Sequence, residues 1–115
     1  MLITKNDRIK DVKVNMRGGD KQVVLENFLS PDKFPANFRV FAEIVLEPGC
    51  SIGEHQHVNE CEFFFVTEGE AEYNDNGTVI TIKPGDTVVC FDGETHSIAN
   101  RSDKTAKFLA VVITK

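Results

Sequence analysis

The amino-acid sequence predicts a single all-β domain, folded as a sandwich or barrel, and three features support this prediction. The chain has 115 residues, enough for one domain of ordinary size and too few for two. Turn-forming pairs such as Gly-Gly, Ser-Pro, Pro-Gly and Asn-Gly recur at short intervals. The segments between them are rich in β-branched and aromatic residues, which favour strands over helices.

Eight strands are expected between these turns, at residues 22–29, 38–46, 62–67, 70–73, 78–82, 86–91, 95–100 and 107–114. The pair Asn76-Gly77 predicts a tight hairpin because both residues accept a positive φ. No long helix is expected. Within the single domain, residues 1–37 are interpreted as an N-terminal arm and strands that pack on a barrel formed by residues 38–115.

The segment Phe63-Phe64-Phe65-Val66 is apolar at four successive positions, so both faces of this strand avoid water. A second sheet can cover one face. The other face requires the N-terminal segment or a second subunit, unless the strand lies wholly inside a monomer. Because closed two-fold dimers are the commonest soluble oligomers, we expect a homodimer.

Composition excludes several classes of function. A formal net charge of −5 and a pI near 5.1 disfavour a nucleic-acid partner, since no basic segment offsets the repulsion from phosphates. Charged residues interrupt the N-terminal segment, so neither a signal peptide nor a membrane span is expected. Cys50, Cys61 and Cys90 form an odd set without a C-x-x-C spacing, which predicts reduced thiols and a cytoplasmic location.

Four residues form a candidate metal site. His55 and His57 are two positions apart, so on an extended strand both imidazoles point to one side. Glu62 follows after a short turn, and His96 comes just after a glycine turn at the start of a predicted strand. Three imidazoles and a carboxylate suit one divalent transition metal ion such as Mn, Fe, Co, Ni or Zn.

These residues also carry a family resemblance. Gly49, His55, His57, Glu62 and Gly69 match every fixed position of the first cupin motif, G-x5-H-x-H-x3 or 4-E-x6-G. After a spacer of 15 residues, the second motif, G-x5-P-x-G-x2-H-x3-N, is matched by Gly85, Gly93, His96 and Asn100. Phe91 stands where that motif usually has proline, a position in a turn rather than among the ligands.

The sequence therefore resembles the cupin superfamily, which implies a double-stranded β-helix, also called a jelly roll. The resemblance implies that the four residues above are metal ligands and that Asn100 is a structural hydrogen-bonding residue. Members of the superfamily include dioxygenases, decarboxylases, sugar isomerases and non-catalytic binders. Short single-domain members with this ligand set most resemble oxalate-binding and decarboxylase-like proteins.

The ligand set itself favours anionic partners. Four protein ligands leave two positions on an octahedral ion, which a bidentate acid can occupy. With one carboxylate among them, a divalent ion keeps a formal charge of about +1. Our first hypothesis is a small metal-dependent enzyme acting on an organic acid by dioxygenase- or decarboxylase-type chemistry. The alternative is a binding or sensing module without turnover.

Other polar residues have less specific interpretations. Arg39 and Glu43 are expected on one face of the 38–46 strand; Arg39 binds a substrate carboxylate if that face lines the barrel, and the two form a salt bridge if it faces water. Glu54 and Glu60 could support the metal ligands or act as acid-base groups, but solvated loop carboxylates are the expected identity of both. The glycines of the segment 16–20 allow a bend that folds an N-terminal arm against the barrel or a partner, and an ordinary loop is equally compatible with them.

Overall fold

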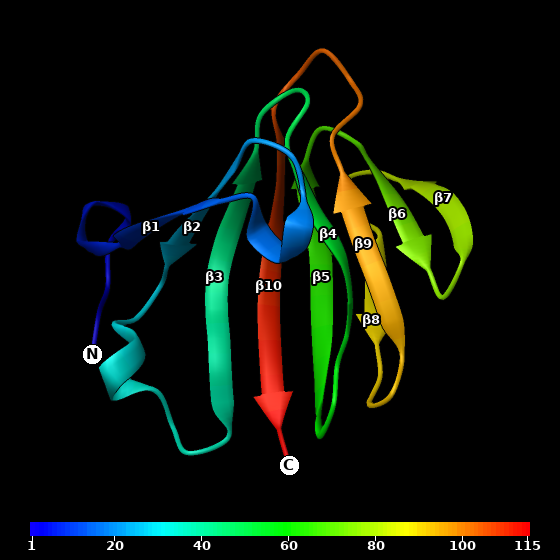
Figure 1. Ribbon diagram of the computed structural model, residues 1–115. Helices are drawn as coiled ribbons and strands as arrows, with labels where there is room; N and C mark the ends of the chain where they lie inside the picture. The colour runs from blue at the N-terminus through cyan, green and yellow to red at the C-terminus, as the bar shows by residue number, and fades with distance from the viewer.

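The computed structural model describes all residues from 1 to 115 and arranges ten antiparallel strands in two facing sheets (Figure 1). The six-stranded sheet has the order β1-β2-β3-β10-β5-β8, and the four-stranded sheet has the order β4-β9-β6-β7. The strands are β1 (Ile9–Val14), β2 (Gln22–Asn27), β3 (Phe38–Leu46), β4 (Ser51–Gln56), β5 (Glu60–Glu68), β6 (Ala71–Asp75), β7 (Thr78–Ile82), β8 (Thr87–Cys90), β9 (Thr95–Ala99) and β10 (Ala106–Thr114).

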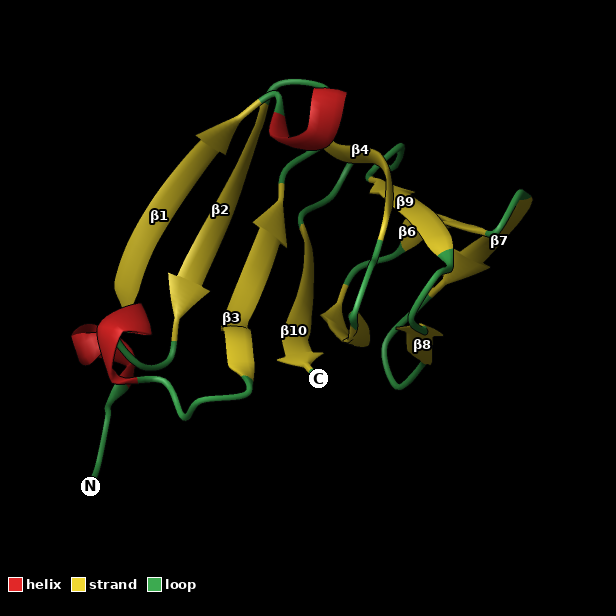
Figure 2. Ribbon diagram, turned by 60° about the horizontal axis from the view of Figure 1, so that its bottom comes forward, coloured by secondary structure: helices red, strands yellow, loops and turns green.

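Helical structure is confined to three single 3-10 turns, η1 (Lys5–Asp7), η2 (Met16–Gly18) and η3 (Pro31–Lys33). None of them has the length or the hydropathy of a membrane-spanning helix. In Figure 2 the β1–β2 hairpin continues the large sheet beyond the smaller one, and its η2 turn comes back to the start of β4. The hairpin therefore brings residues from the N-terminal part of the chain to the end of the second sheet.

The core fills the space between the two sheets. Alternate residues of the central strands point inward, as expected for strands with one covered face. The core is a cluster of 16 buried residues. It includes Val23 and Leu25 of β2, Ile44 of β3, Phe64 of β5 and Phe108 of β10. Residues of the N-terminal part, in β2, thus contribute to the same core as the barrel strands.

The all-β prediction is confirmed, as is the absence of a long helix. The eight expected strands are all present, but β1 and β4 were not among them. All but one of the residues of β1 are exposed. The strand therefore contains the charged residues Lys10, Asp11 and Lys13, which do not favour strands, and the sequence pattern does not reveal it. In β4 the sequence Ser-Ile-Gly-Glu-His-Gln contains few residues that favour strands.

The apolar segment of β5 has one covered and one open face. Phe64 and Val66 are buried between the sheets, whereas the ring of Phe65 is 42% exposed on the outer face of the large sheet. The N-terminal strands lie beside β3, as an extension of the sheet's edge (Figure 1). The outer face of β5 is therefore not covered by the N-terminal segment.

Asn100, at the end of β9, ties three segments together in the interior. Its side-chain amide donates hydrogen bonds to the carbonyl oxygens of Leu46 (2.8 Å) and Lys104 (2.7 Å). Its side-chain oxygen accepts hydrogen bonds from the backbone N–H and the hydroxyl of Ser102, at 3.0 and 2.7 Å. Since the residue is 1% exposed, the loss of this side chain would leave buried groups without partners.

Replacing Asn100 by alanine is expected to lower the free energy of unfolding by about 2–4 kcal/mol, because buried backbone groups lose their hydrogen bonds. Urea denaturation of the wild type and N100A measures the difference. The matched control is N6A, which removes an exposed asparagine whose side chain makes no hydrogen bond and should change stability by less than about 0.5 kcal/mol. Equal losses in the two variants would contradict the structural role of Asn100.

Candidate metal centre

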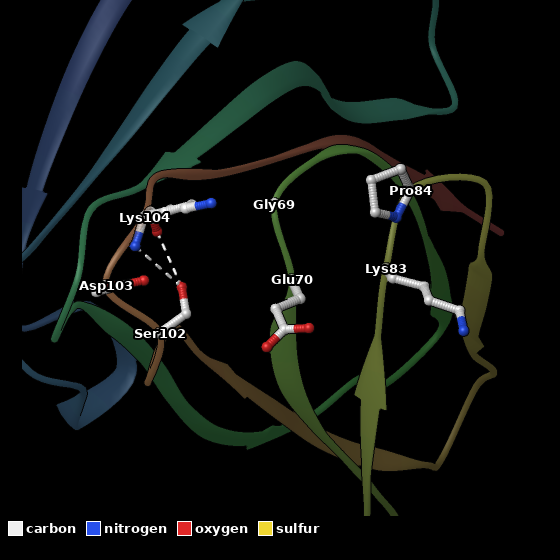
Figure 3. A pocket seen from close by; sticks show the side chains of 7 residues that line it. All are labelled: Gly69, Glu70, Lys83, Pro84, Ser102, Asp103 and Lys104. Atoms are coloured by element: carbon white, nitrogen blue, oxygen red, sulfur yellow. Dashed lines mark hydrogen bonds between the residues drawn. The ribbon is translucent and has the colours of Figure 1, made fainter.

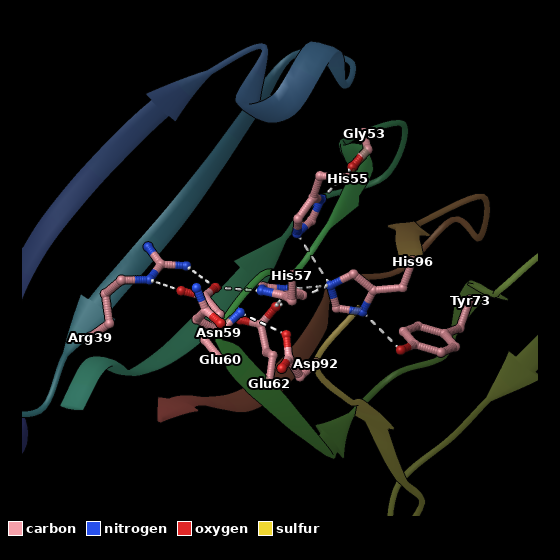
Figure 4. Close-up of polar contacts among 10 residues, drawn as sticks. All are labelled: Arg39, Gly53, His55, His57, Asn59, Glu60, Glu62, Tyr73, Asp92 and His96. Carbon is pink, nitrogen blue, oxygen red and sulfur yellow. Dashed lines mark hydrogen bonds and ion pairs between the residues drawn. The ribbon is translucent and has the colours of Figure 1, made fainter. Parts of the chain in front are cut away.

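Four side chains converge on one point between the sheets, and they are His55, His57, Glu62 and His96 (Figure 4). Their ligand atoms all lie within 4.8 Å of one another. His57 Nε2 lies 3.0 Å from both His96 Nε2 and Glu62 Oε1. His96 Nε2 lies 3.1 Å from Glu62 Oε1 and 3.2 Å from His55 Nε2. The structure thus brings together all four residues that the sequence singled out.

A bulge in β4 directs His55, and His57 directly after the strand, inward. Ile52 pairs with Ile98 and His55 pairs with His96, so β4 has one residue more than β9 between these two pairs. Without this residue, Ile52 and His55 would point to opposite faces. The bulge allows Ile52 to enter the core while His55 and His57 face the ligand group. Glu62 comes from β5 in the other sheet, so the group bridges both sheets.

The other ring nitrogen of each histidine has its own partner. His55 Nδ1 lies 2.8 Å from the carbonyl oxygen of Gly53, and His96 Nδ1 lies 2.8 Å from the hydroxyl of Tyr73. His57 Nδ1 lies 2.5 Å from the carboxylate of Glu60. The carbonyl and the carboxylate can only accept, so they fix the proton of His55 and His57 on Nδ1. Such partners orient the Nε2 lone pairs of metal-binding histidines.

The distances fit a metal ion rather than a set of mutual hydrogen bonds. Neutral imidazoles with Nδ1 protonated present lone pairs at Nε2, and these repel one another and the Glu62 carboxylate at 3.0–3.2 Å. Two ligands about 2.1 Å from an ion and at right angles to each other are about 3.0 Å apart. This matches the observed separations. The cluster of three histidines and one glutamate could therefore hold a metal ion in its centre.

Electrostatics keep the carboxylate ionised. Burial would raise the pKa of Glu62, but hydrogen bonds that the rings of His57 and His96 donate to it when protonated at Nε2 outweigh burial, so in the metal-free protein the pKa lies below its usual range. The same hydrogen bond stabilises protonated His57 and raises its pKa. Burial lowers the pKa of His55. The four side chains therefore carry one permanent negative charge, on Glu62. Among the three histidines, His57 holds a proton most strongly, so a proton competes with a metal ion mainly at this ring.

Arg39 and Glu60 support His57 from the opening of the barrel. Arg39 donates hydrogen bonds from Nε and Nη2 to the two carboxylate oxygens of Glu60, both at 2.7 Å. The side chain of Glu60 is only 13% exposed, so its interpretation as a solvated loop carboxylate is wrong. Glu60 instead holds the His57 ring. Glu54 is exposed and contacts Asn74, in line with its expected place in solvent.

A second bulge decides the position of Arg39. Val112 pairs with Val40 and Ile113 pairs with Phe38, so Arg39 is the extra residue of β3. The prediction that Arg39 and Glu43 share a face is therefore wrong. Glu43 lies on the outer face and pairs with Arg8 at 3.1 Å, whereas Arg39 borders the cavity beside the histidines.

That cavity is small, about 40 Å³. This is room for one or two water molecules or for part of a small ligand. Half of its lining residues are apolar, and two are arginines. The lining consists of Met16, Arg17, Leu25, Arg39, Val40, Ile44, Ile52, His55, His57 and Glu62.

A wider hollow of about 420 Å³ shares no residue with this cavity (Figure 3). Its lining carries both signs of charge, with Lys83 and Lys104 beside Glu70 and Asp103. It contains no histidine or cysteine, the residues that transition-metal sites most often use, and it lies apart from the histidine cluster.

The loops around the histidines are held by backbone contacts. His57 donates its N–H to Glu94 O (3.0 Å) and accepts a hydrogen bond from the N–H of Gly93 (2.7 Å). At the position where the second motif usually has proline, the N–H of Phe91 donates to the Glu94 carboxylate at 2.8 Å. Proline has no N–H and could not make this bond. Phe91 thus closes the loop differently and leaves His96 in place.

The cysteines do not join the group. Cys50 and Cys90 are buried core residues, and Cys61 pairs with Ile113 on the outer face of the large sheet. Burial raises the pKa of the Cys90 thiol to about 12, so it remains a neutral thiol beside Glu62. None of the three forms a disulfide.

Comparison with known proteins agrees with this geometry. Residues 42–112 match the cupin domain family. The chain is also 36% identical over 113 residues to a protein of Thermotoga maritima named "Oxalate-binding protein", covering 97% of this chain and 93% of the relative. The chain belongs to the cupin family.

Solved structures resemble this cupin over nearly its whole length. The crystal structure of a predicted oxalate decarboxylase from Thermotoga maritima has a TM-score of 0.93 and 36% identity, with complete coverage of both chains. The polyketide cyclase RemF from Streptomyces resistomycificus has a TM-score of 0.81 at 21% identity, covering 99% of this cupin and 78% of that chain. The second match shows the fold alone. The predicted double-stranded β-helix is confirmed.

Sequence reasoning missed two supporting side chains. Glu60 follows His57 by three positions, a spacing that could have indicated a partner for the ring. Tyr73 gave a weaker signal, because its hydroxyl contacts His96 across two strands, and only the pairing of β6 with β9 reveals this proximity.

Replacing His57 by alanine is expected to abolish stoichiometric metal binding, because two of the shortest ligand separations involve this ring. Metal analysis after reconstitution measures the loss, and circular dichroism should show an intact barrel, whose stability rests on the apolar core. The control V58A alters an exposed neighbour and should bind metal like the wild type. Equal metal content in H57A and wild type would refute the assignment.

Metal affinity is expected to rise with pH between 5 and 8. The pKa of His57 is raised, chiefly by its hydrogen bond with Glu62, so in the metal-free protein a proton is retained there to higher pH than on an ordinary imidazole, and a metal ion must displace it. Glu62 stays ionised in this range because its pKa is lowered. Competition with a chelator at several pH values should show affinity falling by up to about tenfold per unit toward pH 5. A flat profile would exclude proton competition at this ring.

Proposed function

We propose that this cupin binds a small organic acid on one divalent transition-metal ion, Mn, Fe, Co, Ni or Zn, held by His55, His57, Glu62 and His96. The observation that carries the proposal is the convergence of three fixed Nε2 atoms and one ionised carboxylate beside a cavity of about 40 Å³. The cavity size favours small ligands.

Charge supports an acid over a neutral ligand. One carboxylate leaves a divalent ion with a formal charge of about +1, and an ion that prefers six ligands has two positions for a chelating oxygen ligand. The surrounding walls from Leu25, Val40, Ile44 and Ile52 are apolar, which strengthens electrostatic attraction. The name of the Thermotoga relative points in the same direction, toward oxalate and acids of similar size.

Arg39 is proposed to contact the acid. Its Nε and Nη2 are engaged by Glu60, but Nη1 makes no hydrogen bond within the protein. An arginine can hold one carboxylate along one edge and donate to another group from the remaining nitrogen. Glu60 contacts both Arg39 and His57, so it holds the two side chains in a fixed relation. An acid bound to Arg39 would therefore also affect the orientation of the His57 ring.

The lining favours binding over decarboxylation. A decarboxylase-type reaction needs a proton donor near the carbon that loses carbon dioxide. The cavity is bordered by five apolar residues, two arginines and the metal group, and none of these is a free acid. A non-catalytic binding or sensing role is therefore the first candidate. Dioxygenase-type chemistry, which the ion itself would supply when bound, is the second, because the ligand count leaves coordination positions open.

Calorimetric titration of Mn-, Fe- and Ni-loaded protein with oxalate, a 2-oxo acid and a neutral diol tests the proposal. Acids should bind at least about tenfold more tightly than the diol, and metal-free protein should bind neither. Oxygen uptake and carbon dioxide release are followed in the same samples. Turnover with any metal would favour the enzymatic candidate; failure of the acids to bind would overturn the proposal.

We further propose a homodimer formed through the outer face of the large sheet. Register places Phe41, Val111, Phe63 and Val89 side by side in one row across β3, β10, β5 and β8. Phe65 (42% exposed) and Leu109 pair in the adjacent row. A stable interface needs about 800 Å² per partner, and this largely apolar face, bordered by Glu43 and Thr87 and left open by the N-terminal segment, is proposed to supply it.

Sedimentation at micromolar concentration should show twice the 12.8 kDa monomer mass. F65D places a charge in the proposed interface and should shift the equilibrium to monomer. The control V79D changes a residue that is 56% exposed on β7, in the other sheet, and should remain dimeric. A wild-type protein that sediments only as a monomer would exclude the dimer.

A cytoplasmic location is proposed from the cysteines. Cys50, Cys61 and Cys90 are all free, and reduced thiols are usual in the reducing cytosol. Fractionation of the native host tests this location.

A further inference from the structure

The turn between β1 and β2 places two residues, Met16 and Arg17, at the cavity beside the metal centre. This turn belongs to the N-terminal part of the chain, far in sequence from the motif residues. Figure 4 shows it above His55 and the start of β4. It is therefore a part of the cavity wall that the ligand motifs do not specify.

Close backbone packing fixes the turn on β4. A Cβ atom on Gly53 would lie 2.1 Å from the carbonyl oxygen of Arg17, and one on Gly19 would lie 2.2 Å from the carbonyl oxygen of Ser51. Only glycine fits at both positions. The N–H of Asp20 also donates to the Ser51 hydroxyl at 2.8 Å. Gly53 is the residue whose carbonyl accepts from His55, so the turn rests directly on a partner of the metal group.

Arg17 itself has an unusual conformation and no partner. Its φ of 54° and ψ of 30° lie in the left-handed region, which is uncommon for a residue with a side chain. The guanidinium forms no ion pair and no hydrogen bond, although acidic residues outnumber basic ones in this chain by 18 to 13. The other cavity arginine, Arg39, is neutralised by Glu60. Arg17 thus lines the cavity as an exposed residue whose positive charge no carboxylate of the protein neutralises.

We infer that Arg17 determines ligand specificity by binding the oxygen atoms of the acid that point away from the metal. This inference rests on the proposed function. A ligand with a second carboxylate offers a planar pair of oxygens that a guanidinium recognises, whereas a monoacid chelator lacks that second charge. Arg17 therefore selects small dicarboxylates over 2-hydroxy monoacids bound to the same ion.

The test compares oxalate with glycolate on Mn-loaded protein by calorimetry, because both chelate a metal but only oxalate carries a second carboxylate. Wild type should prefer oxalate. R17Q should lose at least about tenfold of this preference. R17G removes the same side chain at a position where glycine accepts the positive φ, so it should keep or raise the melting temperature while losing the same preference.

Metal content measured in both variants should equal that of the wild type, since Arg17 is not a ligand. R101Q, which removes a guanidinium paired with Glu72 outside this cavity, is the matched control and should keep the preference. If R17Q and R17G retain the wild-type oxalate preference, Arg17 has no role in selection, while acid binding itself stands. If wild type binds neither acid, the proposed function falls and this inference falls with it.

Discussion

The convergence of three imidazole Nε2 atoms on one carboxylate is the constraint on which the rest of this structure depends. At separations of 3.0–3.2 Å, lone pairs of neutral rings are repulsive unless a proton or a cation lies between them. Each ring is held in this arrangement by a separate acceptor or hydroxyl at Nδ1. The folded chain thus holds four electron-rich ligand atoms close together, and a metal ion bound between them would relieve their repulsion.

Two bulges in the backbone direct side chains toward the metal centre. In β4 an extra residue beside Gly53 rotates His55 and His57 into the barrel without moving Ile52 out of the core. In β3 an extra residue turns Arg39 toward the cavity, while its expected partner Glu43 stays outside with Arg8. Bulges of this kind re-aim single side chains at small cost to a sheet. Both lie at the rim of the metal centre.

These bulges also explain what sequence could and could not predict. The fold and the four positions of the candidate metal centre follow from motif spacing, since His55, His57 and His96 are the chain's only histidines and Glu62 lies at a fixed distance from them. The side of the sheet on which Arg39 lies could not be predicted from sequence. Side chains of a strand alternate between its two faces, but this alternation is interrupted at the extra residue of a bulge. Glu60 looked like a loop carboxylate because its two partners, Arg39 and His57, come together only when β3 reaches the mouth of the barrel. The β1 strand was hidden by its charges, because an exposed edge strand needs few apolar residues.

The contact of Gly19 and Gly53 joins the β1–β2 turn to β4, and it brings together two parts of the chain with different proposed roles. The candidate metal ligands lie between residues 55 and 96, whereas Met16 and Arg17, which line the cavity, lie in a short hairpin turn at the surface. The backbone of this turn is fixed by the contacts of Gly19 and Gly53, but its exposed side chains, such as that of Arg17, can be substituted far more readily than those of core strands. On the inference that Arg17 selects the acid, a cupin with the same three histidines and glutamate can acquire a preference for a different small molecule through side-chain changes in this turn alone, without any change at the metal centre.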